Sequence, residues 1–185
     1  MKLFKKVLAI AMASALALTL LVGCGKDDGK TTFTVVDYLN DCAAMQGADV
    51  TFKAATALDT NAKNTVTVLQ KNSDAKTVEE LYKKVDGDPI LKAAVGEAVS
   101  GGDTKNAYAI GFASTRSYIT DAAKDSAGYL QAAELLEQNV VVYTPDAAKG
   151  EDKLERTLYV GTTTMTLGGK NCLVAVVRTA VKAAK

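Results

Sequence analysis

The chain has 185 residues, with 22 basic and 21 acidic side chains and a formal net charge of +1. This near-neutral balance argues against nucleic-acid binding, which needs clustered Lys and Arg side chains. Histidine is absent, which excludes Ser-His and Cys-His nucleophile pairs and every histidine-ligated metal site. We therefore expect no nucleic-acid partner, no metal and no cofactor.

The first two dozen residues combine a positive start, an apolar run and an end made of small residues. Lys2, Lys5 and Lys6 precede a segment, residues 7–25, without a charged side chain. A cationic segment followed by an apolar helix and small residues is the pattern of a secretory signal peptide. The alternative is an uncleaved membrane span, for which roughly 20 apolar residues are needed. Alanine and hydroxyl residues dilute the apolar run, so the signal peptide is the preferred interpretation.

The end of this segment, Leu21-Val22-Gly23-Cys24, resembles the lipobox of bacterial lipoproteins. The resemblance implies cleavage before Cys24 and a diacylglycerol on the Cys24 sulfur, with residues 1–23 as the signal peptide. Two acyl chains are sufficient for stable attachment to a membrane without a spanning helix. We therefore expect an extracytoplasmic lipoprotein held at the cell membrane through Cys24.

The rest of the chain divides into a tether and one domain. Residues 24–32 are mostly polar and contain glycine, which is typical of a flexible tether. Residues 33–185 are long enough for a single domain with a sizeable core.

The first half of the domain predicts three helices. Thr34 and Thr77 are each followed three residues later by an acidic residue, Asp37 or Glu80, which is the capping-box signature of a helix start. Pro89 suits the first position of a third helix. Glycines predict where the first and third of these helices end, at Gly47 and at Gly101-Gly102.

Two strands are predicted between the first two of these helices. Residues 49–55 alternate apolar and polar side chains, and residues 65–70 carry Val66 and Val68 in the same alternation. We expect these two strands to pair as a hairpin across the polar loop 59–64.

The second half is richer in strands. Residues 106–113 predict a central strand in which Ala107, Ala109, Gly111 and Ala113 form a small-residue face that a helix can approach closely. A helix over 118–138 and a short buried strand over 140–143 follow. Two long strands, 154–167 and 172–181, are joined by a turn that contains Gly168 and Gly169.

These elements predict an α+β fold. We expect a mainly antiparallel sheet of about five or six strands, with the helices packed on one face.

Cys42 and Cys172 lie near opposite ends of the domain. In an exported protein they could form a disulfide, whereas buried free thiols are the ordinary alternative. The sequence leaves both open.

Polar residues at three places in the sequence are candidates for a site. Ser114, Thr115, Arg116 and Ser117 follow the central strand, where backbone N–H groups and an arginine could bind an anion; an ordinary helix cap is the alternative. Ser73-Asp74-Ala75-Lys76 matches the S-x-x-K pattern of penicillin-recognising serine enzymes, without the other motifs of that class.

The third cluster, Asp86 and Asp88, offers two carboxylates to a hard cation such as Ca²⁺. A turn followed by a helix cap at Asp88 is the preferred interpretation, because the neighbouring residues supply few of the roughly six oxygen ligands that calcium needs. We therefore assign no catalytic residue and no metal ligand.

By elimination, we expect a non-catalytic binding or assembly module with a protein partner at the cell surface. Two alternatives remain open. One is a small hydrolase that acts on cell-envelope material through Ser/Thr, Lys or carboxylate groups, and the other is a small-molecule receptor.

Overall fold

The computed structural model describes residues 34–115, 121–146 and 154–182. The signal-peptide segment, Cys24 and the tether lie outside these ranges. Within them, no helix has both the length and the apolar character needed to cross a membrane.

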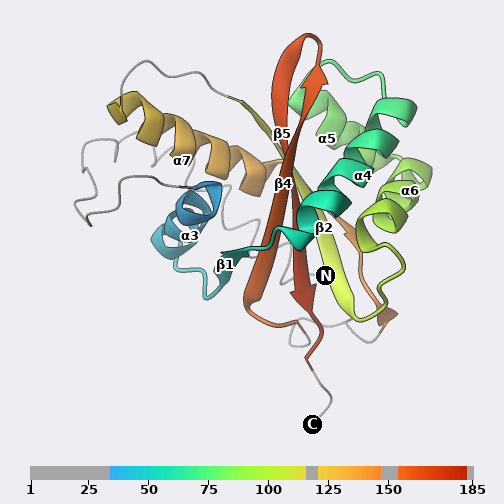
Figure 1. The fold of residues 1–185 in the computed structure, drawn as a ribbon, viewed down its shortest axis with the longest axis horizontal. Coiled ribbons are helices and arrows are strands. Elements are labelled where there is room, and N and C mark those ends of the chain that lie inside the picture. The colour runs from blue at the N-terminus through green and yellow to red at the C-terminus, as the bar shows by residue number, and fades with distance from the viewer. Residues whose placement is uncertain (1–33, 116–120, 147–153, 183–185) are drawn as a thin grey trace.

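The described elements mix helices and strands along the chain (Figure 1). In chain order they are α3 (Val35–Met45), β1 (Thr51–Ala54), α4 (Ala57–Asn72), α5 (Val78–Gly87), α6 (Pro89–Ser100), β2 (Asn106–Ser114), α7 (Asp121–Glu137), β3 (Asn139–Tyr143), β4 (Thr157–Leu167) and β5 (Lys170–Ala180).

The strands form one five-stranded sheet in the order β1-β4-β5-β2-β3. The pairs β4–β5, β5–β2 and β2–β3 are antiparallel, whereas β1 and β4 are parallel. The predicted α+β class and the mainly antiparallel sheet are thus confirmed.

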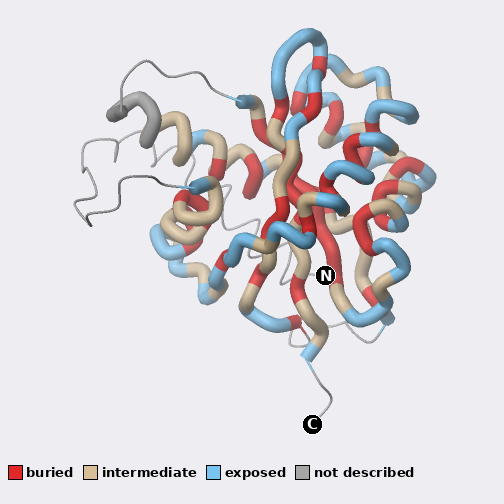
Figure 2. Tube along the Cα trace, in the orientation of Figure 1, coloured by how far each residue is buried: buried red, intermediate tan, exposed pale blue. Residues whose placement is uncertain are grey.

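The helices cover both faces of the sheet, so the expectation that they pack on one face is wrong (Figure 1). Helices α3 and α7 pack on the face that carries Ala107, Ala109 and Ala113. Helices α4, α5 and α6 pack on the opposite face, which carries Ile110 and Phe112. The physical reason is visible in β2, whose interior positions are all buried (Figure 2). A strand that is apolar on both sides needs cover on both sides.

The small-residue face of β2 admits a helix closely, as predicted. A Cβ atom at Gly111 would lie 2.8 Å from the carbonyl oxygen of Leu135 in α7. That distance is too short for any side chain, so glycine at position 111 sets how near α7 lies to the sheet.

Helix α4 replaces the strand predicted over residues 65–70, and the predicted hairpin with β1 does not exist. Strand β1 instead pairs with β4, about a hundred residues later. The alternation of Val66 and Val68 suggested a strand, but the buried side chains of α4 recur with helical spacing. They are Leu58, Ala62, Thr65, Val66 and Leu69.

The local signals for helix starts and turns were correct. Thr34 accepts a hydrogen bond from the backbone N–H of Asp37, and Asp88 accepts from Ile90 and Leu91 at the start of α6. Gly168 and Gly169 have φ values of 54° and 80° in the turn between β4 and β5. Those angles favour glycine because a Cβ atom is strained there.

Candidate functional site

One row of side chains crosses all five strands near one end of the sheet. Successive register pairs place Lys53 beside Tyr159, Tyr159 beside Arg178, Arg178 beside Tyr108, and Tyr108 beside Tyr143. The three tyrosines contact the core beneath α4, α5 and α6, so the row lies on that face. We call these five residues the tyrosine–arginine row.

Neighbours within the row contact one another. The guanidinium carbon of Arg178 lies 5.1 Å from the ring centroid of Tyr159, a cation–π distance. The rings of Tyr108 and Tyr143 are 6.4 Å apart and tilted by 54°, which is within the range of favourable aromatic pairs. These contacts fix the orientation of Arg178 and of the Tyr108–Tyr143 pair.

Asp103, in the loop before β2, anchors the aromatic end of the row. Its Oδ2 atom accepts hydrogen bonds from the Tyr108 hydroxyl at 2.8 Å and from the Asn106 side chain at 2.5 Å. Its Oδ1 atom accepts from the backbone N–H of Lys105 at 2.7 Å. The carboxylate therefore has donors on both oxygens.

These contacts shift two pKa values in opposite directions. Partial burial pushes the pKa of Asp103 upward, but the hydrogen bonds from Asn106, Lys105 and Tyr108 together lower it below its ordinary value. Burial raises the pKa of Tyr108 to about 12, with help from the hydrogen bond to Asp103 and its charge, and against the effect of Arg178. Asp103 is therefore charged and Tyr108 neutral at physiological pH.

The side chains of the row differ in their exposure to solvent. Tyr108 is buried, Tyr143, Tyr159 and Arg178 are half-buried, and Lys53 is exposed. Within the described ranges, neither Lys53 nor Arg178 forms an ion pair. Tyrosine and arginine are enriched at the energetic centres of protein interfaces, so this arrangement is chemically suited to binding.

In the cluster at the end of β2, the hydrogen-bond donors of Ser114 and Thr115 already have acceptors within the protein. The backbone N–H and the hydroxyl of Ser114 both donate to the Glu134 carboxylate, each at 3.1 Å. The N–H and hydroxyl of Thr115 both donate to the carbonyl of Asn171. The protein's own carboxylate thus lies where an anion was expected to bind Ser114. Arg116 and Ser117 lie outside the described residues, and anion binding there stays a prediction.

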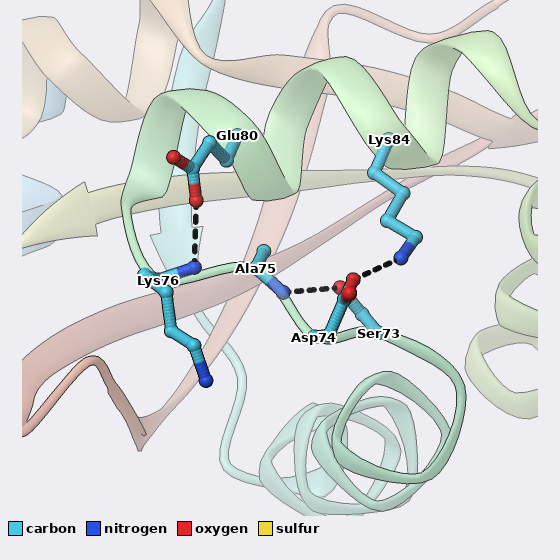
Figure 3. A network of polar contacts seen from close by, with 6 residues as sticks. All are labelled: Ser73, Asp74, Ala75, Lys76, Glu80 and Lys84. Atoms are coloured by element: carbon cyan, nitrogen blue, oxygen red, sulfur yellow. Dashed lines mark hydrogen bonds and ion pairs between the residues drawn. The ribbon is translucent and has the colours of Figure 1, made fainter.

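The Ser73–Lys76 stretch does not form a catalytic pair (Figure 3). Ser73 ends α4, and its hydroxyl accepts a hydrogen bond from the N–H of Ala75 at 3.3 Å. Lys76 precedes α5, and its side chain points away from Ser73. Nearby, Lys84 pairs with Asp74, and Glu80 accepts from the Lys76 backbone. These contacts stabilise the loop between α4 and α5.

The carboxylates near Asp86 have structural partners. Asp86 pairs with Lys92 at 2.9 Å, and Asp88 caps α6. No group of three or more His, Cys, Asp or Glu side chains suited to a metal ion occurs in the part of the chain that the structure describes.

Cys42 and Cys172 are buried free thiols. Cys42 lies in the core beneath α3 and α7, and Cys172 in the core on the opposite face. The sheet separates them, so the disulfide left open by the sequence is not formed. Burial raises the pKa of Cys42 to about 11 and that of Cys172 to about 12.

Sequence reasoning missed the tyrosine–arginine row because its members come from five separate strands. Alternation along β2 placed Tyr108 on the large-residue face, but it could not show which residues lie beside it. Only the strand order and the pairing of β1 with β4 bring Lys53, Tyr159 and Arg178 together.

The fold and the row define an α+β domain with a partly exposed row of aromatic and cationic side chains at one end of its sheet. No family model, curated protein or solved structure matches the chain.

Proposed function

We propose that the chain is an extracytoplasmic lipoprotein, anchored through Cys24, whose domain is a non-catalytic binding or assembly module. The lipobox-like sequence before Cys24 supports the anchor. The observation that carries the binding role is the tyrosine–arginine row, in which half-buried Arg178 contacts the Tyr159 ring and has no acidic partner among the described residues.

A short tether would keep this surface near the membrane. Residues 25–32 reach at most about 28 Å when fully extended, and α3 begins shortly after them at Val35. The domain would therefore meet partners that lie at or close to the membrane surface.

No specific observation within the described ranges favours the hydrolase or the small-molecule receptor. The two residues of the S-x-x-K pattern, Ser73 and Lys76, lie at the end of α4 and in the loop that follows it.

The anchor is tested by mass spectrometry of the protein from its native host. We expect Cys24 to be the first residue and to carry acyl chains. A Cys24→Ser variant should leave the membrane fraction. An intact amino-terminal Met1, or an unmodified Cys24 thiol in membrane-bound protein, would contradict the anchor.

The binding role is tested by photo-crosslinking on intact cells. A photoreactive amino acid replaces exposed Lys53 in the row or, as a control, exposed Lys71 near the far end of α4. We expect a discrete adduct from position 53 and none from position 71. Equal labelling from both positions, or none from position 53, would remove the row from the proposed function.

A further inference from the structure

We propose that the tyrosine–arginine row binds an acidic segment of a partner protein, with a partner carboxylate on Arg178. This inference rests on the proposed binding role and adds the chemistry of the partner.

Lys53 and Arg178 flank Tyr159 in the row, and neither has an ion-pair partner among the described residues. The four ion pairs that lie wholly within those residues leave their lysines and arginine neutralised by neighbouring acids. Lys53 and Arg178 are thus two cations from adjacent parts of the sheet that flank one ring, and this paired arrangement is complementary to carboxylates.

The Arg178 guanidinium carbon lies 5.1 Å from the centroid of the Tyr159 ring, and Arg178 also interacts with the Tyr108 hydroxyl. A guanidinium has five N–H donors, so it can keep both contacts and still donate to a carboxylate. Because the ring contact already limits the rotamers of Arg178, less conformational entropy is lost when a partner binds.

The two ends of the row differ in chemistry. Beyond Arg178 the row becomes aromatic, with Tyr108 and Tyr143, and the negative Asp103 lies at that end on the Tyr108 hydroxyl. A complementary segment would place its acidic side chains over Lys53 and Arg178 and an uncharged side chain beside Tyr143. A uniformly charged partner fits only half of the row.

The size of the row also fits a peptide segment. Five strands separated by about 4.8 Å give a row roughly 19 Å long. An extended segment of about six residues spans that length at about 3.3 Å per residue, and it would contact the exposed parts of Lys53, Arg178 and Tyr143, because Tyr108 is buried. Nucleic acids and anionic bilayers are bound through broader basic surfaces, whereas this row has only two cations.

The test uses the full-length protein in phosphatidylcholine nanodiscs. Binding is followed by fluorescence anisotropy with a labelled oligoglutamate peptide that ends in tyrosine. A peptide of the same length with glutamine in place of glutamate is the uncharged control. We expect the acidic peptide alone to bind, and more weakly at high salt.

Variants locate the site. Arg178→Gln should weaken binding of the acidic peptide at least about tenfold, and Arg178→Lys should recover part of the loss because it keeps the charge without the planar fork. Lys53→Gln, at an exposed position that the fold tolerates, should weaken binding several-fold. Lys71→Gln removes the same charge from the far end of α4 and should change binding less than twofold. Circular dichroism and thermal unfolding check that each variant is folded.

Three outcomes would overturn the proposal. They are equal binding of the acidic and uncharged peptides, unchanged binding in both Arg178→Gln and Lys53→Gln, and stronger Arg178-dependent binding of polyphosphate or phosphatidylglycerol vesicles than of the acidic peptide. The last would assign the row to phosphate groups or a lipid surface. A crosslinked adduct from position 53 on cells, without acidic-peptide binding, would retain the binding module and reject only this partner chemistry.

Discussion

The side-chain amide of Asn40 forms two hydrogen bonds with the backbone of Phe52. The Asn40 Nδ2 group donates to the Phe52 carbonyl at 2.9 Å, and the Phe52 N–H donates to Asn40 Oδ1 at 2.7 Å. Phe52 lies in β1, the edge strand that pairs with β4 on its other side. Asn40, from α3, thus occupies the backbone groups that an additional strand would use, and it closes this part of the sheet edge.

We predict that Asn40→Ala lowers the free energy of unfolding by about 1–3 kcal/mol, because two backbone groups of Phe52 lose their partners. The freed edge should also promote association between molecules. Urea unfolding and light scattering measure the two effects. Asn72→Ala, which removes a hydrogen bond to Val68 at an exposed helix end, is the matched control and should cost no more than about 0.5 kcal/mol. Similar losses in both variants would contradict a special role for Asn40.

A second prediction concerns the contact between β2 and α7. Gly111→Ala places a Cβ atom 2.8 Å from the Leu135 carbonyl oxygen, so α7 must shift and unfolding should become easier by about 1–3 kcal/mol. Gly87→Ala, at a helical glycine with nothing within 4 Å of the added Cβ atom, should be neutral or slightly stabilising. Thermal and urea unfolding compare the pair. A Gly111→Ala protein as stable as the parent would mean that α7 is free to move.

A third prediction concerns alkaline pH. The pKa of Tyr108 is raised from 10.0 to about 12, mainly by burial, so the folded protein holds the phenol proton more tightly than the unfolded chain. The contribution of this raised pKa to the free energy of unfolding is fully present below pH 10 and is lost as the pH rises toward 12. Tyr108→Phe should therefore show a weaker loss of stability over that window than the parent.

Urea unfolding at several alkaline pH values measures this difference, and Tyr82→Phe, at a half-buried position on α5, is the control. Because lysines titrate in the same window, the informative quantity is the difference between parent and variant. Parallel pH profiles for the parent and Tyr108→Phe would contradict the assignment.

A fourth prediction concerns the thiols. Cys42 and Cys172 are buried, and their pKa values are raised to about 11 and about 12, so little thiolate is present at neutral pH. Iodoacetamide should leave both residues unmodified in the folded protein and alkylate both after unfolding without reductant. Peptide mass spectrometry measures the modification. Alkylation that requires prior reduction would show a disulfide instead.

Local signals in the sequence were sufficient for much of the secondary structure. The helix starts at Thr34 and Asp88 depend on hydrogen bonds within three residues, and the turn at Gly168-Gly169 depends on backbone angles that favour glycine. The small-residue face of β2 likewise predicted the close approach of a helix. Such features need no knowledge of distant residues, so a single sequence reveals them.

The candidate anion site shows what neighbouring residues in the sequence cannot predict. The cluster after β2 was visible in the sequence, but Glu134 lies 20 residues after Ser114, and its carboxylate takes both Ser114 donors. Helix α4 shows the same limit. Val66 and Val68 alternate as strand residues do, but in the fold the buried side chains of this segment lie on one face of a helix.

The sequence by itself determined the α+β class, the caps and turns, and the lipobox-like segment on which the proposed anchor depends. The tertiary structure decided which faces the helices cover, how Asn40 closes the edge at Phe52, and which side chains form the tyrosine–arginine row. The reason is that caps and turns arise from interactions between near neighbours, whereas strand order and register join segments about a hundred residues apart, such as β1 and β4.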